Sequence, residues 1–550
     1  MKVKNPILRG FYPDPSIVRV GDDYYIANST FEWWPGVSLH HSRDLVHWEK
    51  LPSPLNRQSQ LDLRGVGASQ GIWAPCLTYD NGTFYLVYTV VKSFYCNMYD
   101  TANFLVTATD ILGPWSEPIA LNNFGFDPSL FHDDDGRKYM VSMVTDHRVP
   151  KKYVGRLVLQ EYDDEQKKMV GPVREIFCAD KVYLEGPHIF KRKDWYYLFA
   201  ADTGTGELHG QSILRSKNVW GSYEWYEGNS ILTAREHPDF LLQKSGHCDL
   251  VETQNGEWYA VHLCGRALEN RNPMDAPRFA GARRYTLGRE TCIQKMKWTK
   301  DDWLVLANGT TLPDLETEVP DELADKAQAE QKNQQKQHDQ QEFGDGMFDD
   351  FDDPSGLSVV YQTLRQPLTP GYWSLTERSG YLRLRGQEGL SSKFNQSLIA
   401  RRWEEFCFET ATCVEFEPEV FKQMAGLILM YDQDNYFYLH VTFDEDEGKC
   451  ITLLTAENKK YEYPAGFVPI ESGKPVYLKA AVDYDKAQFF YAVGNQNYQA
   501  IGPVLDASIL SDEACNEGWF TGAMAGICCQ DLTGFGKPQI LIGSHIKMCN

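Results

Sequence analysis

A short pattern recurs five times in the first half of the chain. Each copy has a short apolar segment, a polar turn and an aromatic segment, and the copies open at Asp14, Ala74, Asp127, Glu185 and His247. Successive copies start about 60 residues apart, which is typical of propellers and solenoids. The apolar and aromatic segments joined by a turn predict a β-hairpin in each copy. We therefore predict a β-propeller with five blades.

The residues that open the copies are the first candidates for a functional site. The first strand of each propeller blade lines the central axis, so the opening residues should converge there. Taken alone, Asp14 and Asp127 before proline are often only turn residues, and Glu185 could be a solvated loop acid. Because acids occupy the same point of three repeats, we favour a shared carboxylate site with a histidine beside it.

Length and charge narrow the class of protein. A chain of 550 residues is too long for one hydrophobic core, so more than one domain is expected. The formal net charge of −22 argues against nucleic acid or an anionic membrane as a partner. The sequence starts without a secretory pattern and contains no apolar run of membrane-spanning length. We therefore expect a cytoplasmic protein.

The pattern of residues changes after the repeats. Residues 1–315 are expected to form the propeller. Residues 316–345 are polar and rich in glutamine, which predicts a solvated linker. Residues 346–550 contain alternating stretches such as 382–385 and 436–441, which indicate strands with one buried face. The predicted fold class is all-β, a five-bladed propeller followed by a β-sandwich.

Three carboxylates at one point suit the cleavage of a glycosidic bond. One acid must protonate the leaving oxygen, while a second carboxylate acts on the opposite face of the sugar as base or nucleophile. A third carboxylate beside the acid raises the pKa of that acid by repulsion. Competing signals are absent: the sequence has no dinucleotide-binding glycine pattern, phosphate-binding loop, Gly-x-Ser-x-Gly elbow or His-Glu-x-x-His.

Several motifs together resemble the β-xylosidases of glycoside hydrolase family 43. In the first half they lie at residues 5–16, 29–36, 71–75, 185–188, 244–247 and 287–291, and in the second half at 399–403 and 518–523. The resemblance covers nearly the whole chain except the glutamine-rich segment. It implies a propeller, a β-sandwich and an inverting mechanism.

The resemblance also implies roles for individual residues. By position, Asp14 resembles the general base, Glu185 the general acid, and Asp127 the residue that tunes and orients the acid. Arg289 resembles the cation that binds the terminal sugar, and the substrate-binding residues would include Phe31, Trp73, Ala74, His247, Arg289 and Phe520. No cofactor is expected to be required. In some family members the axial histidine holds a calcium ion through water, but for His247 we favour a hydrogen bond to a carboxylate.

These implications leave alternatives open. The preferred function is release of xylose from the non-reducing end of β-1,4-xylo-oligosaccharides, by a protein that we expect to form a homo-oligomer. The close alternative is an α-L-arabinofuranosidase or a dual activity, and a more distant one is an inactive carbohydrate-binding propeller. A five-bladed fructosidase is less well supported because its Arg-Asp-Pro and Glu-Cys signatures are not at the matching places. The stretches 143–148 and 201–205 depart from the family pattern, and the first has Thr145 where a tryptophan is expected.

Overall fold

The computed structural model describes residues 1–94, 98–148, 155–179, 182–268, 283–320, 346–516, 518–534 and 538–548. Within these ranges almost all regular structure is strand, and the helices are two short 3-10 turns, η2 (Ala507–Ile509) and η3 (Asp512–Ala514). In the described part of the chain, no helix is long and apolar enough to cross a membrane. The chain divides into two compact units, 1–61, 70–266 and 289–338 in unit 1, and 62–69, 267–288 and 339–550 in unit 2.

Five antiparallel sheets of unit 1 share one plan, in which the order of the strands follows the order of the chain. The sheets are β2 (Ser16–Val20), β3 (Asp23–Asn28), β5 (Ser38–Ser42) and β6 (Glu49–Leu51); β7 (Gly71–Asp80), β8 (Thr83–Ser93), β9 (Asp100–Ala108) and β10 (Ile119–Ala120); β11 (Phe126–His132), β12 (Lys138–Val144), β13 (Gly155–Asp163) and β14 (Lys168–Ala179); β15 (Leu184–Arg192), β16 (Trp195–Asp202), β17 (Gly210–Ser216), β18 (Glu224–Trp225) and β19 (Leu232–Thr233); and β20 (Gln243–Glu252), β21 (Trp258–Gly265), β22 (Glu290–Trp298) and β23 (Leu304–Leu306).

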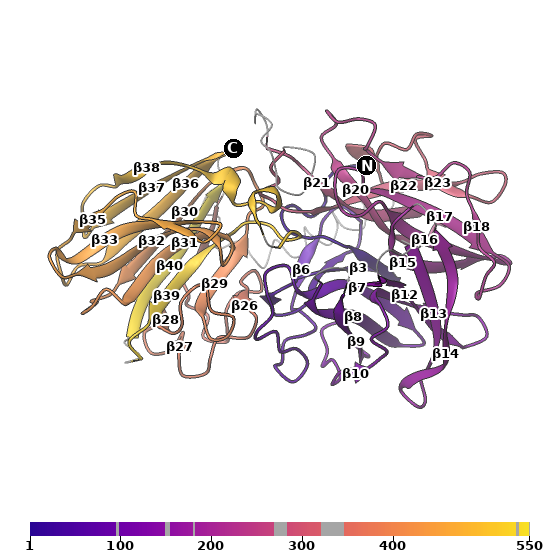
Figure 1. The fold of residues 1–550 in the computed structure, drawn as a ribbon, viewed down its shortest axis with the longest axis horizontal. Coiled ribbons are helices and arrows are strands. Elements are labelled where there is room, and N and C mark those ends of the chain that lie inside the picture. Colours follow the sequence, from indigo (N-terminus) through magenta and orange to yellow (C-terminus); the bar gives the residue numbers. More distant parts are fainter. Residues whose placement is uncertain are drawn as a thin grey trace. The chain divides into compact units, whose positions relative to one another are not determined.

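The first strands of these sheets lie side by side around a common axis. Strand β2 contacts β7 and β20, β11 contacts β7 and β15, and β15 contacts β20, which closes the ring. Figure 1 shows the sheets of this unit arranged around that ring. Because each sheet enters through its first strand, the five repeats meet at the axis. The propeller predicted from the repeats is confirmed.

The two ends of unit 1 are joined by a short ladder. Strand β1 (Lys2–Lys4) pairs antiparallel with β24 (Glu316–Glu318), and β4 (Trp33–Trp34) is a further short strand of this unit. Residues 316–318, which we placed in the linker, therefore belong to this ladder. The rest of the predicted linker, 321–345, lies outside the described residues.

A backbone irregularity sits at the same point of each first strand. Asp14, Ala74, Asp127, Gly186 and His247 all have positive φ, between 29° and 55°. In four of the strands this point also interrupts the pairing with the second strand, as a β-bulge does. The residue of the fourth repeat that matches Asp14 is thus Gly186, and Glu185 precedes it by one. The prediction that the fourth repeat opens at Glu185 was therefore wrong by one residue.

Unit 2 is a sandwich of two antiparallel sheets. One contains β27 (Trp373–Ser374), β28 (Leu382–Arg385), β40 (Pro538–Met548), β30 (Cys407–Glu415), β36 (Val476–Asp483), β37 (Lys486–Val493) and β38 (Gln499–Asp506), with β25 (Gly346–Asp349) paired to β40. The other contains β29 (Ser397–Arg402), β39 (Met524–Asp531), β31 (Gln423–Asp432), β32 (Asn435–Asp444), β33 (Gly448–Glu457) and β34 (Lys460–Glu462), with β35 (Phe467–Pro469) paired to β33. Strand β26 (Thr363–Leu364) also belongs to this unit.

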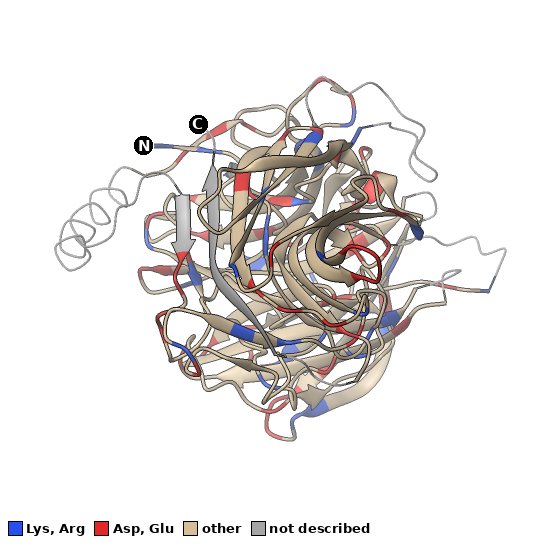
Figure 2. Cartoon of the chain, turned by 90° about the vertical axis from the view of Figure 1, so that its left-hand side faces the viewer, with Lys and Arg blue, Asp and Glu red and all other residues tan. Residues whose placement is uncertain are grey.

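The core of the sandwich comes from alternate residues of both sheets. Leu478 and Phe489 of one sheet belong to the same buried cluster as Leu427, Leu439 and Ile451 of the other. The period-2 pattern seen in the sequence is therefore the pattern of inward-facing side chains, and the predicted β-sandwich is confirmed. Figure 2 shows Lys and Arg interspersed with Asp and Glu along the strands and loops, as in an ordinary solvated surface.

Candidate active site

Asp14 is held by two hydrogen bonds at the axial end of the first repeat. Its Oδ1 accepts a bond from Nη1 of Arg289 at 2.7 Å, and its Oδ2 accepts one from Oγ of Ser29 at 2.7 Å. The side chain is 5% exposed. Each carboxylate oxygen has two lone-pair sites, so both oxygens keep one for a further donor. This carboxylate is therefore fixed in place and still able to accept a proton.

Ser29 was not predicted as a site residue. Its hydroxyl donates to Asp14 and accepts a 2.8 Å hydrogen bond from the backbone N–H of Ala74. The predicted site residue Ala74 thus uses its N–H to orient Ser29. Ser29 lies in the family motif at 29–36, but an aromatic residue of that motif, Phe31, was predicted to bind substrate instead of the serine.

Asp127 and Glu185 form a second pair of carboxylates. Oδ2 of Asp127 accepts a 3.1 Å hydrogen bond from the N–H of Gly186, the residue after Glu185. Burial, repulsion from Glu185 and then repulsion from Asp14 raise the pKa of Asp127 well above its ordinary value. Two carboxyl groups in this relation cannot both ionise easily. The pair therefore carries a proton near neutral pH.

The electrostatics of Glu185 suit a proton donor. Burial and then repulsion from Asp14 raise the pKa of Glu185 from 4.5 to about 7, while Arg289 opposes the rise. We expected the repelling charge to come from Asp127, whereas the charge that raises the pKa of Glu185 is that of Asp14. The structure thus places near one another an anchored carboxylate and a carboxyl group that stays protonated to about pH 7.

The bulge separates the positions of the acids along their strands. Asp14 and Asp127 occupy the positive-φ position, whereas Glu185 occupies the preceding one, which holds Trp73 in the second repeat and Phe126 in the third. Successive side chains of a strand point to opposite faces. Glu185 therefore projects differently from Asp14 and Asp127, at the position where two other repeats present an aromatic ring.

His247 stands among the carboxylates. Its Nδ1 lies 3.7 Å from Oδ1 of Asp14, which is a contact rather than a hydrogen bond. Burial lowers the pKa of His247 to about 4, so the imidazole is neutral at neutral pH. A Cβ on Gly186 would lie 2.5 Å from Nε2 of His247, and this close approach requires glycine there.

A calcium ion near His247 was the one metal that the resemblance allowed. Among the described residues, no group of three or more His, Cys, Asp and Glu side chains is arranged to hold a metal ion. The side chains around His247 therefore do not form a direct calcium site, and a water-mediated ion at His247 stays a prediction. No step derived below uses an ion.

Arg289 contacts both Asp14 and a residue that was not predicted. Besides Asp14, its Nη1 contacts Oγ1 of Thr205 at 3.1 Å. Its guanidinium carbon lies 5.5 Å from the ring centroid of Phe31. Thr205 belongs to the stretch 201–205 that departs from the family pattern, and its contact with Arg289 was not predicted.

An aromatic cluster extends from Phe31. Its centroid is 6.0 Å from that of Trp73, and the Trp73 ring contacts Phe94, Tyr99 and Phe126. The predicted residues Phe31 and Trp73 are thus adjacent, and both are buried. The other three aromatic residues were not predicted, although Phe126 stands directly before Asp127.

Phe520, the last predicted substrate-binding residue, belongs to unit 2. It is half-exposed, its ring centroid is 6.2 Å from that of Trp519, and its backbone N–H points to the hydroxyl of Tyr431 at 3.5 Å. The side chain is thus not buried in the core of the sandwich. Its role at the sugar site stays a prediction.

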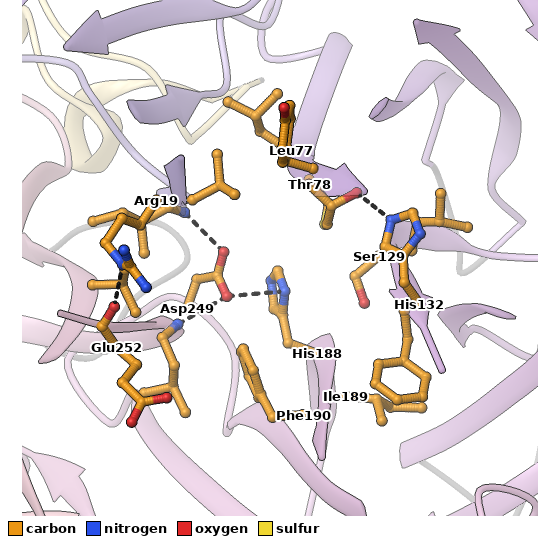
Figure 3. A pocket seen from close by; sticks show the side chains of 18 of the residues that line it. Arg19, Leu77, Thr78, Ser129, His132, His188, Ile189, Phe190, Asp249 and Glu252 are labelled. Carbon is orange, nitrogen blue, oxygen red and sulfur yellow. Dashed lines mark hydrogen bonds and ion pairs between the residues drawn. The ribbon is translucent and has the colours of Figure 1, made fainter. Parts of the chain in front are cut away.

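A second ring of axial side chains begins two residues further along the first strands. Cys76, Ser129, His188 and Asp249 line a cavity of about 390 Å³, and Figure 3 shows His188 directed toward Asp249. Oδ1 of Asp249 lies 3.4 Å from Nδ1 of His188, and its Oδ2 accepts a 2.7 Å bond from Oγ of Ser16. The hydrogen bond and the contact together join three of the first strands beneath the carboxylates.

Comparisons with known proteins match both units. The family described as "Glycosyl hydrolases family 43" matches residues 3–304, and "Beta xylosidase C-terminal Concanavalin A-like domain" matches residues 348–538.

Relatives extend the match over nearly the whole chain. Xylosidase/arabinosidase 43B of Humicola insolens is 44% identical over 97% of this chain and 95% of its own length, and a beta-xylosidase of Bacillus subtilis (strain 168) is 42% identical over 98% of both. The crystal structure of a xylan beta-1,4-xylosidase from Bacillus halodurans C-125 superposes with a TM-score of 0.91 at 44% identity, covering 99% of this chain and 100% of that one. On this evidence, the chain belongs to glycosyl hydrolase family 43.

Proposed function

We propose that the protein is an exo-acting, inverting β-xylosidase that releases xylose from the non-reducing end of β-1,4-xylo-oligosaccharides. The observation that carries the proposal is the pairing of the anchored carboxylate of Asp14 with the raised pKa of Glu185. An inverting glycosidase needs one carboxylate and one carboxylic acid at the same pH. Relatives named as xylosidases over nearly the full length support xylose as the sugar.

In the proposed reaction, Glu185 donates its proton to the glycosidic oxygen as the bond from that oxygen to the anomeric carbon breaks. A water molecule attacks the anomeric carbon from the opposite face and gives its proton to Asp14. The products are xylose with inverted configuration and a shortened oligosaccharide that leaves as an alcohol. Asp14 then holds a proton and Glu185 is ionised, so one proton must move between them or through solvent before the next turnover.

Arg289 has two tasks in this scheme. Its guanidinium donates the 2.7 Å hydrogen bond that holds Asp14, and it is proposed to bind hydroxyls of the terminal sugar as well. By opposing the rise in the pKa of Glu185, it also keeps that acid strong enough to donate. Asp127 accepts a hydrogen bond from the N–H of Gly186 and so orients the strand that carries Glu185.

An α-L-arabinofuranosidase activity is the second candidate. One relative that is 44% identical carries the name xylosidase/arabinosidase. The two activities could share the acid and the base, because both sugars present an anomeric carbon and neighbouring hydroxyls to the same groups.

The test is hydrolysis of 4-nitrophenyl β-D-xylopyranoside, 4-nitrophenyl α-L-arabinofuranoside and xylobiose by the purified protein. We expect xylose release from the xyloside and from xylobiose, and loss of both activities in Asp14→Ala by the roughly 10²–10⁴-fold typical of acid–base groups. Hydrolysis of the arabinofuranoside alone would favour the second candidate. No hydrolysis of any of the three would contradict a hydrolase acting on these sugars.

Three further properties complete the proposal. We propose a cytoplasmic homo-oligomer, which cell fractionation and light scattering would test. The enzyme is expected to keep full activity in EDTA, and a loss restored by calcium would instead support an ion near His247. Phe520 is proposed to contact the terminal sugar.

A further inference from the structure

Tyr183 is the residue two positions before the proposed acid. It lies just ahead of β15, and its carbonyl accepts a 2.9 Å hydrogen bond from the N–H of Thr203. Residues two apart on an extended strand point to the same side, so the Tyr183 side chain flanks that of Glu185. The side chain is partly buried, so that only part of it can meet a ligand.

Its electrostatics agree with this position. Burial and repulsion from Glu185, together with effects of Tyr99 and Asp127, raise the pKa of Tyr183 well above its ordinary value. The phenol is therefore neutral at every pH at which the enzyme would work, and its hydroxyl can both donate and accept a hydrogen bond.

Tyr99 joins Tyr183 to the aromatic cluster. The Tyr99 hydroxyl interacts with the phenol of Tyr183 and contributes to the rise in its pKa. The Tyr99 ring is stacked on Phe126 with a centroid distance of 5.2 Å and an interplanar angle of 27°, and it meets Trp73 edge-on at 6.2 Å. Phe126 and Trp73 are buried, whereas Tyr99 is only half-buried. Tyr99 is thus a packed ring with part of its surface exposed.

The general acid defines which sugar these tyrosines can meet. A general acid must reach the oxygen between the sugar that is cleaved off and the sugar that leaves. The terminal sugar lies between the acid and the base, so side chains that flank the acid away from Asp14 face the leaving sugar. Tyr183 interacts with Glu185, Tyr99 and Asp127, whereas Arg289 and Phe31 lie beside Asp14.

We propose that Tyr183 and Tyr99 form the subsite for the leaving xylose residue, an inference that rests on the β-xylosidase function proposed above. The exposed part of a tyrosine ring offers a flat apolar surface to the face of a pyranose, while the hydroxyl offers a hydrogen bond to a sugar hydroxyl. Because the two phenols interact with one another, they act on a ligand at the same place. The pair therefore selects a sugar as the leaving group rather than merely completing the fold.

The experiment compares two substrates that differ only in the leaving group. Xylobiose fills the proposed subsite, whereas β-D-xylosyl fluoride has no second sugar to contact it. Tyr183→Phe and Tyr99→Phe each remove one hydroxyl and keep the ring. A neutral hydrogen bond contributes about 0.5–1.5 kcal/mol, so we expect kcat/KM on xylobiose to fall roughly 2- to 12-fold and kcat/KM on the fluoride to stay within about twofold.

Tyr183→Ala removes the ring as well. We expect a fall of about 10-fold or more on xylobiose, again with little change on the fluoride. The matched control is Tyr498→Phe, a tyrosine of unit 2 that is 43% exposed, and it should change neither substrate. Thermal unfolding of each variant verifies that it is folded, and the two phenylalanine variants preserve the test should Tyr183→Ala fail to fold.

The outcomes separate the alternatives. Selective loss on xylobiose supports the subsite. Equal loss on both substrates would mean that Tyr183 acts by positioning Glu185, and no loss on xylobiose would mean that it does not touch the leaving sugar; either result overturns the proposal. Failure of the proposed function would appear earlier, because the wild-type enzyme itself would release no xylose from xylobiose.

Discussion

The raised pKa of Glu185 predicts how the enzyme responds to pH. With a pKa of about 7 in place of the usual 4.5, about 90% of the Glu185 side chains are protonated at pH 6, against about 3% for an unperturbed glutamate. The environment thus supplies about 30 times more of the active acid at that pH. Since the protonated form is the active one, activity is present below pH 7 and lost above it. We expect kcat/KM for xylobiose to fall about tenfold between pH 6 and pH 8.

The assay uses leaving groups of different basicity. The kcat/KM of xylobiose hydrolysis, measured from pH 5 to pH 9, should show the alkaline limb near pH 7. A 2,4-dinitrophenyl xyloside needs no proton on its leaving group, so its limb should be absent or much weaker. Glu185→Gln should lose most activity on xylobiose and remove the limb. An equally steep limb on both substrates, or a limb that persists in Glu185→Gln, would refute the assignment of Glu185 as the acid.

Three further predictions concern stability and binding. First, Glu185→Gln should stabilise the protein by up to about 3 kcal/mol at pH 8 and have little effect at pH 4, because a carboxyl group whose folded pKa is raised costs stability as the pH rises through that value. Calorimetric melting at the two pH values measures this difference. An unchanged or lower melting temperature of the variant at pH 8 would contradict it. Second, Gly186→Ala should abolish most activity, because the new methyl group would meet His247 at 2.5 Å and the backbone of Gly186 has a φ of 53°. The control is Gly256→Ala, because Gly256 also has positive φ but its new methyl group would meet only the end of a side chain at 3.7 Å. Equal activity of the two variants would contradict this prediction. Third, Phe520→Ala should raise KM for xylobiose with little change in melting temperature, and an unchanged KM would remove Phe520 from the sugar site.

The repeats in the sequence carried most of the information about the fold. Each hairpin is local in sequence, so its turn and its apolar and aromatic segments could be recognised. Because the first strand of every propeller blade lines the axis, the residues that open the hairpins were then expected to meet. The period-2 stretches of the second half predicted the sandwich for the same reason. The linker was harder to delimit, because 316–318 gain their partner from Lys2–Lys4, more than 300 residues away in the chain.

The charged residues of the candidate site were predicted from the sequence, whereas residues that hold them in place, such as Ser29, were not. Asp14 and Arg289 stood in motifs and Asp127 opened a repeat, whereas nothing in the motif at 29–36 marked the hydroxyl of Ser29 as the partner of Asp14. Glu185 is offset by one residue because the positive φ of this repeat falls on Gly186. The Gly186-Pro187 pair suggested an irregular backbone there, but the residue with positive φ could be identified only from the structure. The contribution of Asp14 to the pKa of Glu185 is a property of three-dimensional distance and could not be read from spacing.

The stereochemistry of the first product tests the central claim most directly. If Asp14 acts as a base on water and Glu185 as the acid, their carboxyl groups should be separated by roughly 6.5–9.5 Å, and the xylose first released should have inverted configuration. Proton NMR spectra recorded in the first minutes of hydrolysis of 4-nitrophenyl β-D-xylopyranoside, before mutarotation, distinguish the two anomers of the single xylose that each turnover forms. We expect α-xylose to appear first. Initial formation of β-xylose would show that Asp14 is a nucleophile and would contradict the mechanism.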